Sequence, residues 1–74
     1  MKKLSSLQSS LPQLITQVEE GDLKHRLYDL GVYPDQTIKM LKKAPFGDPL
    51  LVDVEGQTVM LRLSEADLIS VVEK

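Results

Sequence analysis

Three residues within one short segment carry side chains that could bind a divalent metal ion. His25 is the single histidine of the chain, Asp22 lies three residues before it and Asp29 four residues after it. On a helix this spacing places two carboxylates and an imidazole on one face, a donor set suited to Fe²⁺ or Mn²⁺. The simpler interpretation is a solvated helix on which Asp22 caps the first turn and Asp29 pairs with nearby Lys or Arg. The pattern therefore indicates a metal site only as an alternative.

Signatures of catalysis do not occur in the sequence. Gly47-Asp48 lacks the further glycines and the following Lys-Ser/Thr of a nucleotide-binding loop, and it indicates a turn instead. The serines have no nucleophile-elbow context, and a surface loop explains the adjacent Glu19 and Glu20. Cysteine is absent, which excludes disulfides and thiolate ligands. We therefore expect no enzymatic activity and no required cofactor.

The basic residues Lys39, Lys42 and Lys43 form one cluster. On a regular strand Lys39 and Lys43 share a face, while Lys42 points the other way. Small barrels that bind nucleic acid usually combine such charge with stacking aromatic rings, which are few in this chain. The net charge of −2 also argues against a dedicated nucleic-acid binder. A strand edge protected by lysines is the simpler interpretation, and nucleic-acid binding is the rival.

Phe46 lies between Pro45 and Gly47 at the tip of an expected turn. A large apolar ring at such a tip either faces a partner or folds back over the end of the domain. Proline limits the freedom of the unbound turn and so reduces the ordering cost of binding. Phe46 is therefore a candidate docking residue.

The hydrophobic pattern around these residues predicts short strands. A short helical turn at the opening leucines leads into them, and Glu55-Gly56 is suited to a tight hairpin turn. Ser64 can cap a single helical turn, with Asp67 standing in for the capping-box acid. The predicted strands cover Gln13–Val18, Thr37–Lys43, residues 50–55, residues 58–63 and residues 68–72.

One helix is predicted between the first two strands. Gly21-Asp22 opens it, and apolar residues recur along one face at Leu23, Leu27 and Leu30. Gly31 is placed where a helix end needs a residue with positive φ.

Length and composition limit the protein to a single domain over residues 1–74. No apolar run approaches the roughly 20 residues needed to span a bilayer, so we expect a cytoplasmic protein. Strands this short and few commonly close into a small barrel, which removes exposed edges. The expected fold is mainly β (small α+β): an SH3-like five-stranded β-barrel with one short inserted helix.

The order of these motifs resembles the FeoA family, small cytoplasmic accessory proteins of ferrous-iron uptake. The resemblance is collinear from Leu4 to the end of the sequence. It departs from the family pattern at Ser9-Ser10, Gln13 and Asp35, where glycine or a Pro-Gly pair is usual. The matching motifs are Leu4-Ser5-Ser6-Leu7, Arg26-Leu27-Tyr28-Asp29-Leu30-Gly31 with Pro34, Ala44 to Pro49, Val52 with Val54, Gly56, Leu61-Arg62, and Ser64-Glu65-Ala66.

The resemblance implies an SH3-like fold and a role in assisting FeoB, a membrane ferrous-iron permease with a cytoplasmic GTPase domain. The implied mechanism is docking on FeoB that modulates transport or nucleotide turnover. Whether the protein activates or inhibits, and whether it forms a homodimer by strand exchange, stays open. The candidate contact residues are Leu27, Leu30 and Gly31 of the helix, with Pro45, Phe46, Gly47, Asp48 and Pro49 of the turn.

Related domains form the C-terminus of DtxR-type metal-dependent repressors. The alternative function is therefore a transition-metal-binding sensor domain that uses Asp22, His25 and Asp29. A nucleic-acid-binding small barrel that uses Lys39, Lys42 and Lys43 is a second alternative.

Overall fold

The computed structural model describes residues 2–74. Within them all strand pairs are antiparallel, in the order β1-β6-β2-β3-β4-β5. The mainly β fold with a helix after the first long strand agrees with the sequence prediction, and a two-residue strand at the start was not foreseen. The elements are β1 (Lys2–Lys3), the 3₁₀ turn η1 (Leu4–Ser6), β2 (Gln13–Val18), α1 (Lys24–Asp29), β3 (Thr37–Lys43), β4 (Leu50–Val54), β5 (Gln57–Leu61), α2 (Leu63–Ala66) and β6 (Ile69–Glu73).

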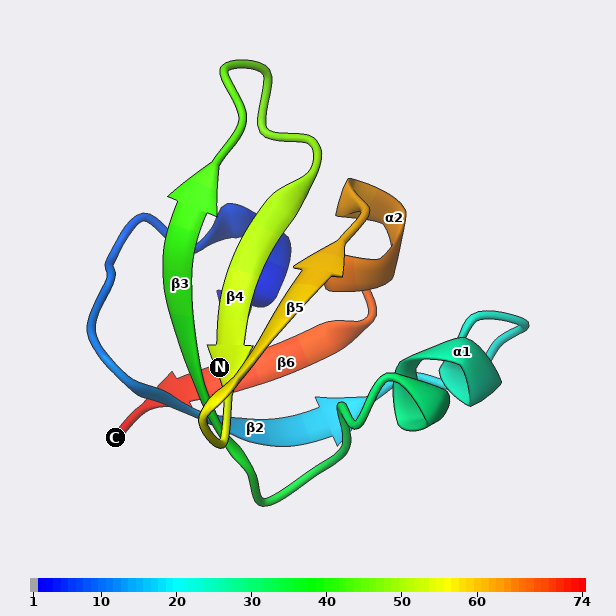
Figure 1. The fold of residues 1–74 in the computed structure, drawn as a ribbon. Helices are drawn as coiled ribbons and strands as arrows, with labels where there is room; N and C mark the ends of the chain where they lie inside the picture. The colour runs from blue at the N-terminus through cyan, green and yellow to red at the C-terminus, as the bar shows by residue number, and fades with distance from the viewer. Residues whose placement is uncertain (1) are drawn as a thin grey trace.

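The sheet curls around one apolar core without closing completely. Strands β3, β4 and β5 stand side by side and cross β2 and β6, while α1 lies to one side (Figure 1). The end strands β1 and β5 are not hydrogen-bonded neighbours, so the expected barrel keeps two free edges. Residues from η1, α1, α2 and the strands form the core: Leu4, Leu7, Ile15, Val18, Leu27, Val32, Ile38, Met40, Leu50, Val52, Val54, Val59, Leu61, Ala66, Ile69 and Val71.

Strands β2 and β3 each contain a β-bulge that interrupts the regular alternation of side chains. In β2 the register shifts between Ile15 and Gln17, so Ile15 and Val18 are both buried although regular alternation would separate them. In β3 the shift falls between Met40 and Lys42. Bulges also increase the local twist, which helps a short sheet to curl.

The bulge in β3 corrects the expected arrangement of the lysines. Lys39 and Lys42 pair with outward-facing residues of β4, whereas Lys43 pairs with the buried Leu50. The Lys43 ammonium donates to the Ser5 carbonyl oxygen at 3.4 Å. Lys39 and Lys42 therefore share the outer face, and the prediction that Lys39 shares a face with Lys43 is wrong.

The α1 helix begins later than predicted but ends where predicted. Leu23 takes the N-cap position and the Lys24 N–H donates to the Gly21 carbonyl at 3.1 Å, so a turn precedes the helix. Asp22 lies in that turn, is exposed and does not act as the expected cap. Gly31 adopts the expected positive φ of 87° and ends the helix.

The α2 turn is capped by a different residue from the one predicted. Leu63 is its first residue instead of the end of β5, which places Arg62 at the N-cap position. Glu65, three residues after Arg62, accepts from the Arg62 backbone N–H at 2.8 Å. Ser64 and Asp67, the predicted cap and capping-box acid, are exposed and lie two positions too late for these roles.

The β4–β5 hairpin confirms the predicted two-residue turn. Glu55 and Gly56 both have positive φ, 51° and 90°, as a turn matched to the twist of the strands requires. The Asp53 carboxylate accepts from the Gly56 N–H at 2.8 Å, and the Glu55 carboxylate accepts from the Thr37 N–H at 2.6 Å. No helix within residues 2–74 is long and apolar enough to cross a membrane.

Candidate functional site

The turn between β3 and β4 presents an aromatic ring to solvent. The Ala44 N–H donates to the Pro49 carbonyl at 3.1 Å, and the Gly47 N–H donates to the Ala44 carbonyl at 2.7 Å. Gly47 takes a φ of 81°, which reverses the chain within a few residues. Phe46 is 95% exposed at the tip. The ring therefore does not fold back over the domain, which removes one of its two interpretations.

Asp48 ties this turn to the start of α2. Its Oδ1 accepts from the Leu63 backbone N–H at 3.0 Å and lies 3.5 Å from Arg62 Nε. Leu63 is the first residue of α2, so the carboxylate satisfies a backbone N–H that the helix itself leaves without a partner. Asp48 thus contributes to the turn as an anchor, and Phe46 and Pro45 are the turn residues most available to a partner.

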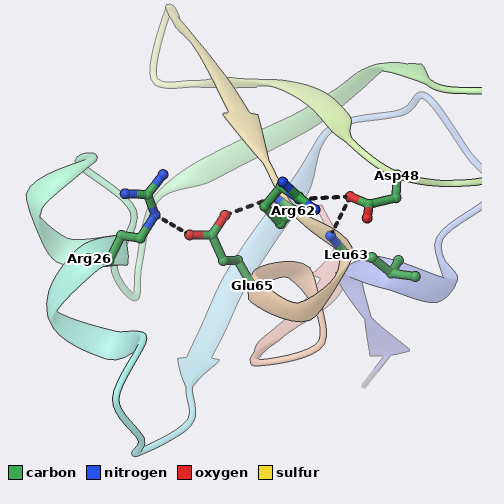
Figure 2. A network of polar contacts seen from close by, with 5 residues as sticks. All are labelled: Arg26, Asp48, Arg62, Leu63 and Glu65. Carbon is green, nitrogen blue, oxygen red and sulfur yellow. Dashed lines mark hydrogen bonds and ion pairs between the residues drawn. The ribbon is translucent and has the colours of Figure 1, made fainter.

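Glu65 continues the polar connection from α2 to α1. Its side chain is 2% exposed, and one oxygen accepts from the Arg62 N–H while the other lies 2.5 Å from Arg26 Nε. Figure 2 shows these contacts as a chain from Arg26 through Glu65 and Arg62 to Asp48. The two elements predicted to contact a partner, α1 and the turn, are therefore joined by one polar network.

The sequence contained a signal for this network that the prediction did not use. Glu65 lies three residues after the N-cap position of α2, the spacing of a capping box. The pairing with Arg26 joins residues 39 positions apart, which no local pattern reveals.

The candidate contact residues of α1 are not equally accessible. Leu27 is fully buried, and Leu30 is half-buried against the core. Gly31 is half-buried at the helix end. Leu27 therefore packs in the core and presents no side-chain surface to a partner in this structure.

Two exposed tyrosines that the prediction left out lie in α1 and in the segment that follows it, Tyr28 and Tyr33. The Tyr28 and Tyr33 ring centroids lie 5.9 Å apart, and Lys24 Nζ lies 5.6 Å from the Tyr28 centroid. The hydrogen bond from Lys24 to Glu20 lowers the pKa of the Glu20 carboxyl and raises the pKa of the Lys24 ammonium. Helix α1 and the segment after it therefore offer a partner two tyrosines beside a solvated ion pair.

The three residues of the alternative metal site are all exposed: Asp22, His25 and Asp29. Within residues 2–74, no group of three or more His, Asp and Glu side chains is arranged to hold a metal ion. The start of α1 at Lys24 leaves Asp22 in the preceding turn, outside the helical spacing on which the prediction depended.

Comparison with known proteins gives a family and a fold. The FeoA domain model matches residues 2–73. The solution structure of iron(II) transport protein A from Clostridium thermocellum is 35% identical with a TM-score of 0.86, and covers 95% of this chain and 44% of that one. The FeoA protein from Chlorobium tepidum is 37% identical with a TM-score of 0.81, and covers 95% of this chain and 68% of that one. No curated protein matches the chain.

The fold also occurs in a longer protein of lower identity. A manganese-dependent transcriptional repressor in complex with manganese has a TM-score of 0.90 at 20% identity. The match covers 99% of this chain and 36% of the repressor, and at 20% identity it shows the fold alone. The present chain likewise spans less than half of the Clostridium thermocellum protein. The match to the domain model covers nearly every residue, and the SH3-like small β fold agrees with it: this chain belongs to the FeoA domain family.

Proposed function

We propose that the protein is a non-enzymatic accessory protein of ferrous-iron uptake, which docks on a FeoB-type transporter and modulates it. The match of the FeoA domain model to residues 2–73 carries this proposal. The likeness to a protein named iron(II) transport protein A, at 35% identity, supports the assignment to iron uptake. The proposed site of action is cytoplasmic, where the GTPase domain of such a transporter lies.

The geometry of the β3–β4 turn supports docking as the mechanism. Phe46 is 95% exposed on a turn closed by two backbone hydrogen bonds and anchored through Asp48. A turn whose backbone is fixed before binding loses less conformational entropy on association than a flexible one. Leu30 and Gly31 of the α1 end, with Pro45 and Phe46 of the turn, form the proposed contact surface, and the Glu65 network fixes α1 relative to the turn.

The two rival functions have less support. The repressor likeness at 20% identity concerns the fold alone, and Asp22, His25 and Asp29 are not gathered into a metal-binding group. The nucleic-acid hypothesis uses three lysines, of which only Lys39 and Lys42 share the outer face, since Lys43 pairs with the buried Leu50.

An amide chemical-shift titration tests the proposed function. The isotopically labelled protein is titrated with the soluble GTPase domain of the transporter, with and without a GTP analogue, and then with the intact transporter in nanodiscs. We expect localised shifts at the end of α1 and at the Phe46 turn. Absence of shifts with both preparations would contradict docking. Shifts with the intact transporter only would place the contact outside the GTPase domain.

A further inference from the structure

The outer face of β3, β4 and β5 carries a shallow apolar groove away from the end of α1. Leu51 and Met60 are register partners on adjacent strands, and Lys42 pairs with Leu51 from the other side. Together with Ala44 and Pro49 they line a pocket of about 280 Å³. We call these five residues the outer-face groove. Met60 is 61% exposed there, an unusual position for a long apolar side chain in a strand.

Further apolar surface continues the outer-face groove at two places. The β3 bulge adds Leu41 beside Lys42, and Leu41 is also exposed. The turn that carries Phe46 connects Ala44 to Pro49, so the exposed ring follows directly from the lining of the groove. A series of exposed apolar side chains along one face typically marks an interaction surface.

The charges on this face select the kind of partner. Within residues 2–74, neither Lys39 nor Lys42 takes part in an ion pair. The one acid paired with them across β4, Asp53, accepts from the Gly56 N–H of the hairpin. The protein as a whole has a net charge of −2, so two unpaired lysines beside an apolar groove make this face a local exception. Such a face attracts carboxylates.

We propose that the outer-face groove binds a short acidic segment of a partner protein. An apolar side chain of that segment packs against Leu51 and Met60, and its carboxylates lie near Lys39 and Lys42. A protein segment fits better than nucleic acid because the five residues of the groove include no aromatic ring for base stacking, and the adjoining turn supplies a single ring, Phe46. That the partner is the transporter rests on the proposed function, whereas the preference for acidic apolar chains does not.

The first experiment tests the groove itself with defined ligands. The labelled protein is titrated with a short peptide of alternating Glu and Leu, with the same peptide carrying Lys in place of Glu, and with an oligothymidine. The acidic peptide is expected to shift the amides of Lys42, Leu51 and Met60, with affinity at least about tenfold above that of the basic peptide. Equal or stronger binding of the basic peptide or the oligothymidine at these amides would overturn the proposal.

Matched variants separate the groove from the rest of the surface. Met60→Gln and Lys42→Glu change exposed residues of the groove, and each is expected to weaken the acidic peptide about tenfold. Leu11→Gln is the control for Met60→Gln, because Leu11 is 56% exposed. Lys2→Glu is the control for the charge reversal, because Lys2 is exposed in β1, at the opposite end of the strand order from β5. Equal effects of variants and controls would overturn the assignment to this groove.

The same variants are then titrated with the intact transporter. Wild-type binding that Met60→Gln and Lys42→Glu weaken supports both the groove and the proposed function. Wild-type binding that these variants leave unchanged contradicts the groove as the transporter contact and leaves the proposed function standing. Failure of the wild type to bind the transporter, with the acidic-peptide result intact, contradicts the proposed function and leaves the groove standing.

Discussion

Arg26 in α1 and Glu65 in α2 form an ion pair in which Nε of the arginine lies 2.5 Å from a carboxylate oxygen. The two side chains have opposite environments, since the arginine is 60% exposed and the glutamate 2%. A carboxylate buried to this degree is costly without partners, and here it accepts from Arg26 and from the Arg62 N–H. The pair therefore holds α1 against α2 and, through Arg62 and Asp48, against the candidate docking turn.

Replacing Arg26 with Ala should destabilise the domain, because it leaves the buried Glu65 carboxylate with fewer donors. We expect a loss of about 1–2 kcal/mol in the free energy of unfolding, the lower part of the usual range for charged hydrogen bonds, because Arg26 is solvent-screened. Urea denaturation monitored by circular dichroism measures it. Arg62→Ala is the control: its ion pair with Asp48 is exposed, and its loss should cost less than about 0.5 kcal/mol. Equal stabilities of the two variants would contradict a stabilising role for the Arg26–Glu65 ion pair.

Phe46→Ala should weaken docking on the transporter without destabilising the fold. The ring is 95% exposed, so its removal should change the free energy of unfolding by less than about 0.5 kcal/mol. Loss of an apolar anchor from an interface commonly costs more than 1 kcal/mol, about a fivefold or greater drop in affinity. Isothermal titration calorimetry and thermal melts measure the two effects. Unchanged affinity would exclude Phe46 from the interface.

Leu27→Ala, unlike Phe46→Ala, should destabilise the fold. Leu27 is fully buried, and truncation of such a side chain costs about 2–5 kcal/mol. Because a domain of this size has only about 3–5 kcal/mol of stability, the variant should be largely unfolded. A circular-dichroism melt measures this loss. A folded Leu27→Ala protein with selectively weakened binding would restore Leu27 as a contact residue.

Gly56→Ala should destabilise the β4–β5 hairpin for a conformational reason alone. A Cβ at Gly56 would meet nothing within 4 Å, but the residue has a φ of 90°. The left-handed region costs a residue with a side chain about 1–2 kcal/mol, and that loss should appear in chemical denaturation. Gln57→Ala, an exposed neighbour in β5, is the control with an expected change near zero. A Gly56→Ala protein as stable as the control would show that the turn relaxes to another geometry.

The Glu20–Lys24 pair should contribute to folding stability in a way that depends on pH in one direction. The hydrogen bond from Lys24 lowers the pKa of Glu20 in the folded protein. Its stabilisation is therefore present above the unfolded-state pKa of glutamate, about 4.3, and is lost as the pH falls through the lower folded-state value. Lys24→Met should move the Glu20 pKa up towards its ordinary value, and Lys24→Arg should not. Carbon-detected titration of the side-chain carboxyl gives the pKa directly.

His25→Ala tests the metal-sensing alternative. Because Asp22, His25 and Asp29 are exposed and not gathered, we expect the affinity for Mn²⁺ to change less than twofold or so on removal of the imidazole. Paramagnetic broadening of amide signals by Mn²⁺ locates any bound ion, and its dependence on Mn²⁺ concentration gives the affinity. Broadening centred on α1 in the wild type, abolished in His25→Ala, would favour a sensor.

Local patterns predicted most of the strands and the hairpin turn. The apolar residues Ile15 and Val18 placed β2, and the Glu55-Gly56 pair identified the hairpin, because both signals are carried by residues close together in the sequence. The α1 helix was placed by its leucine spacing and by Gly31, but Asp22 was misassigned because any Asp near a helix start has the chemistry of a cap.

The candidate site was less predictable because it depends on register. The outward position of Lys42 follows from one extra residue in β3, and no residue type announces a β-bulge. In the sequence, Met60 and Leu51 look like ordinary strand residues. Only the strand pairing shows that they lie opposite each other on the outer face. The Arg26–Glu65 pair joins two helices whose approach is set by the core, so neither residue carries a local sign of it.

The bulge at Leu41 separates two properties that strands usually couple: the side a residue faces and the bend of the strand. A regular ladder over the same residues would turn Lys42 towards the core and Lys43 outwards. Deleting Leu41, by contrast, should let Lys42 and Lys43 keep their present partners on β4 while the strand straightens. Leu41 therefore sets the bend of β3 and not the side that its neighbours face. A single-residue deletion usually reverses the facing of every later residue in a strand, but deletion of Leu41 should change the bend of β3 and leave Lys42 outside and Lys43 inside.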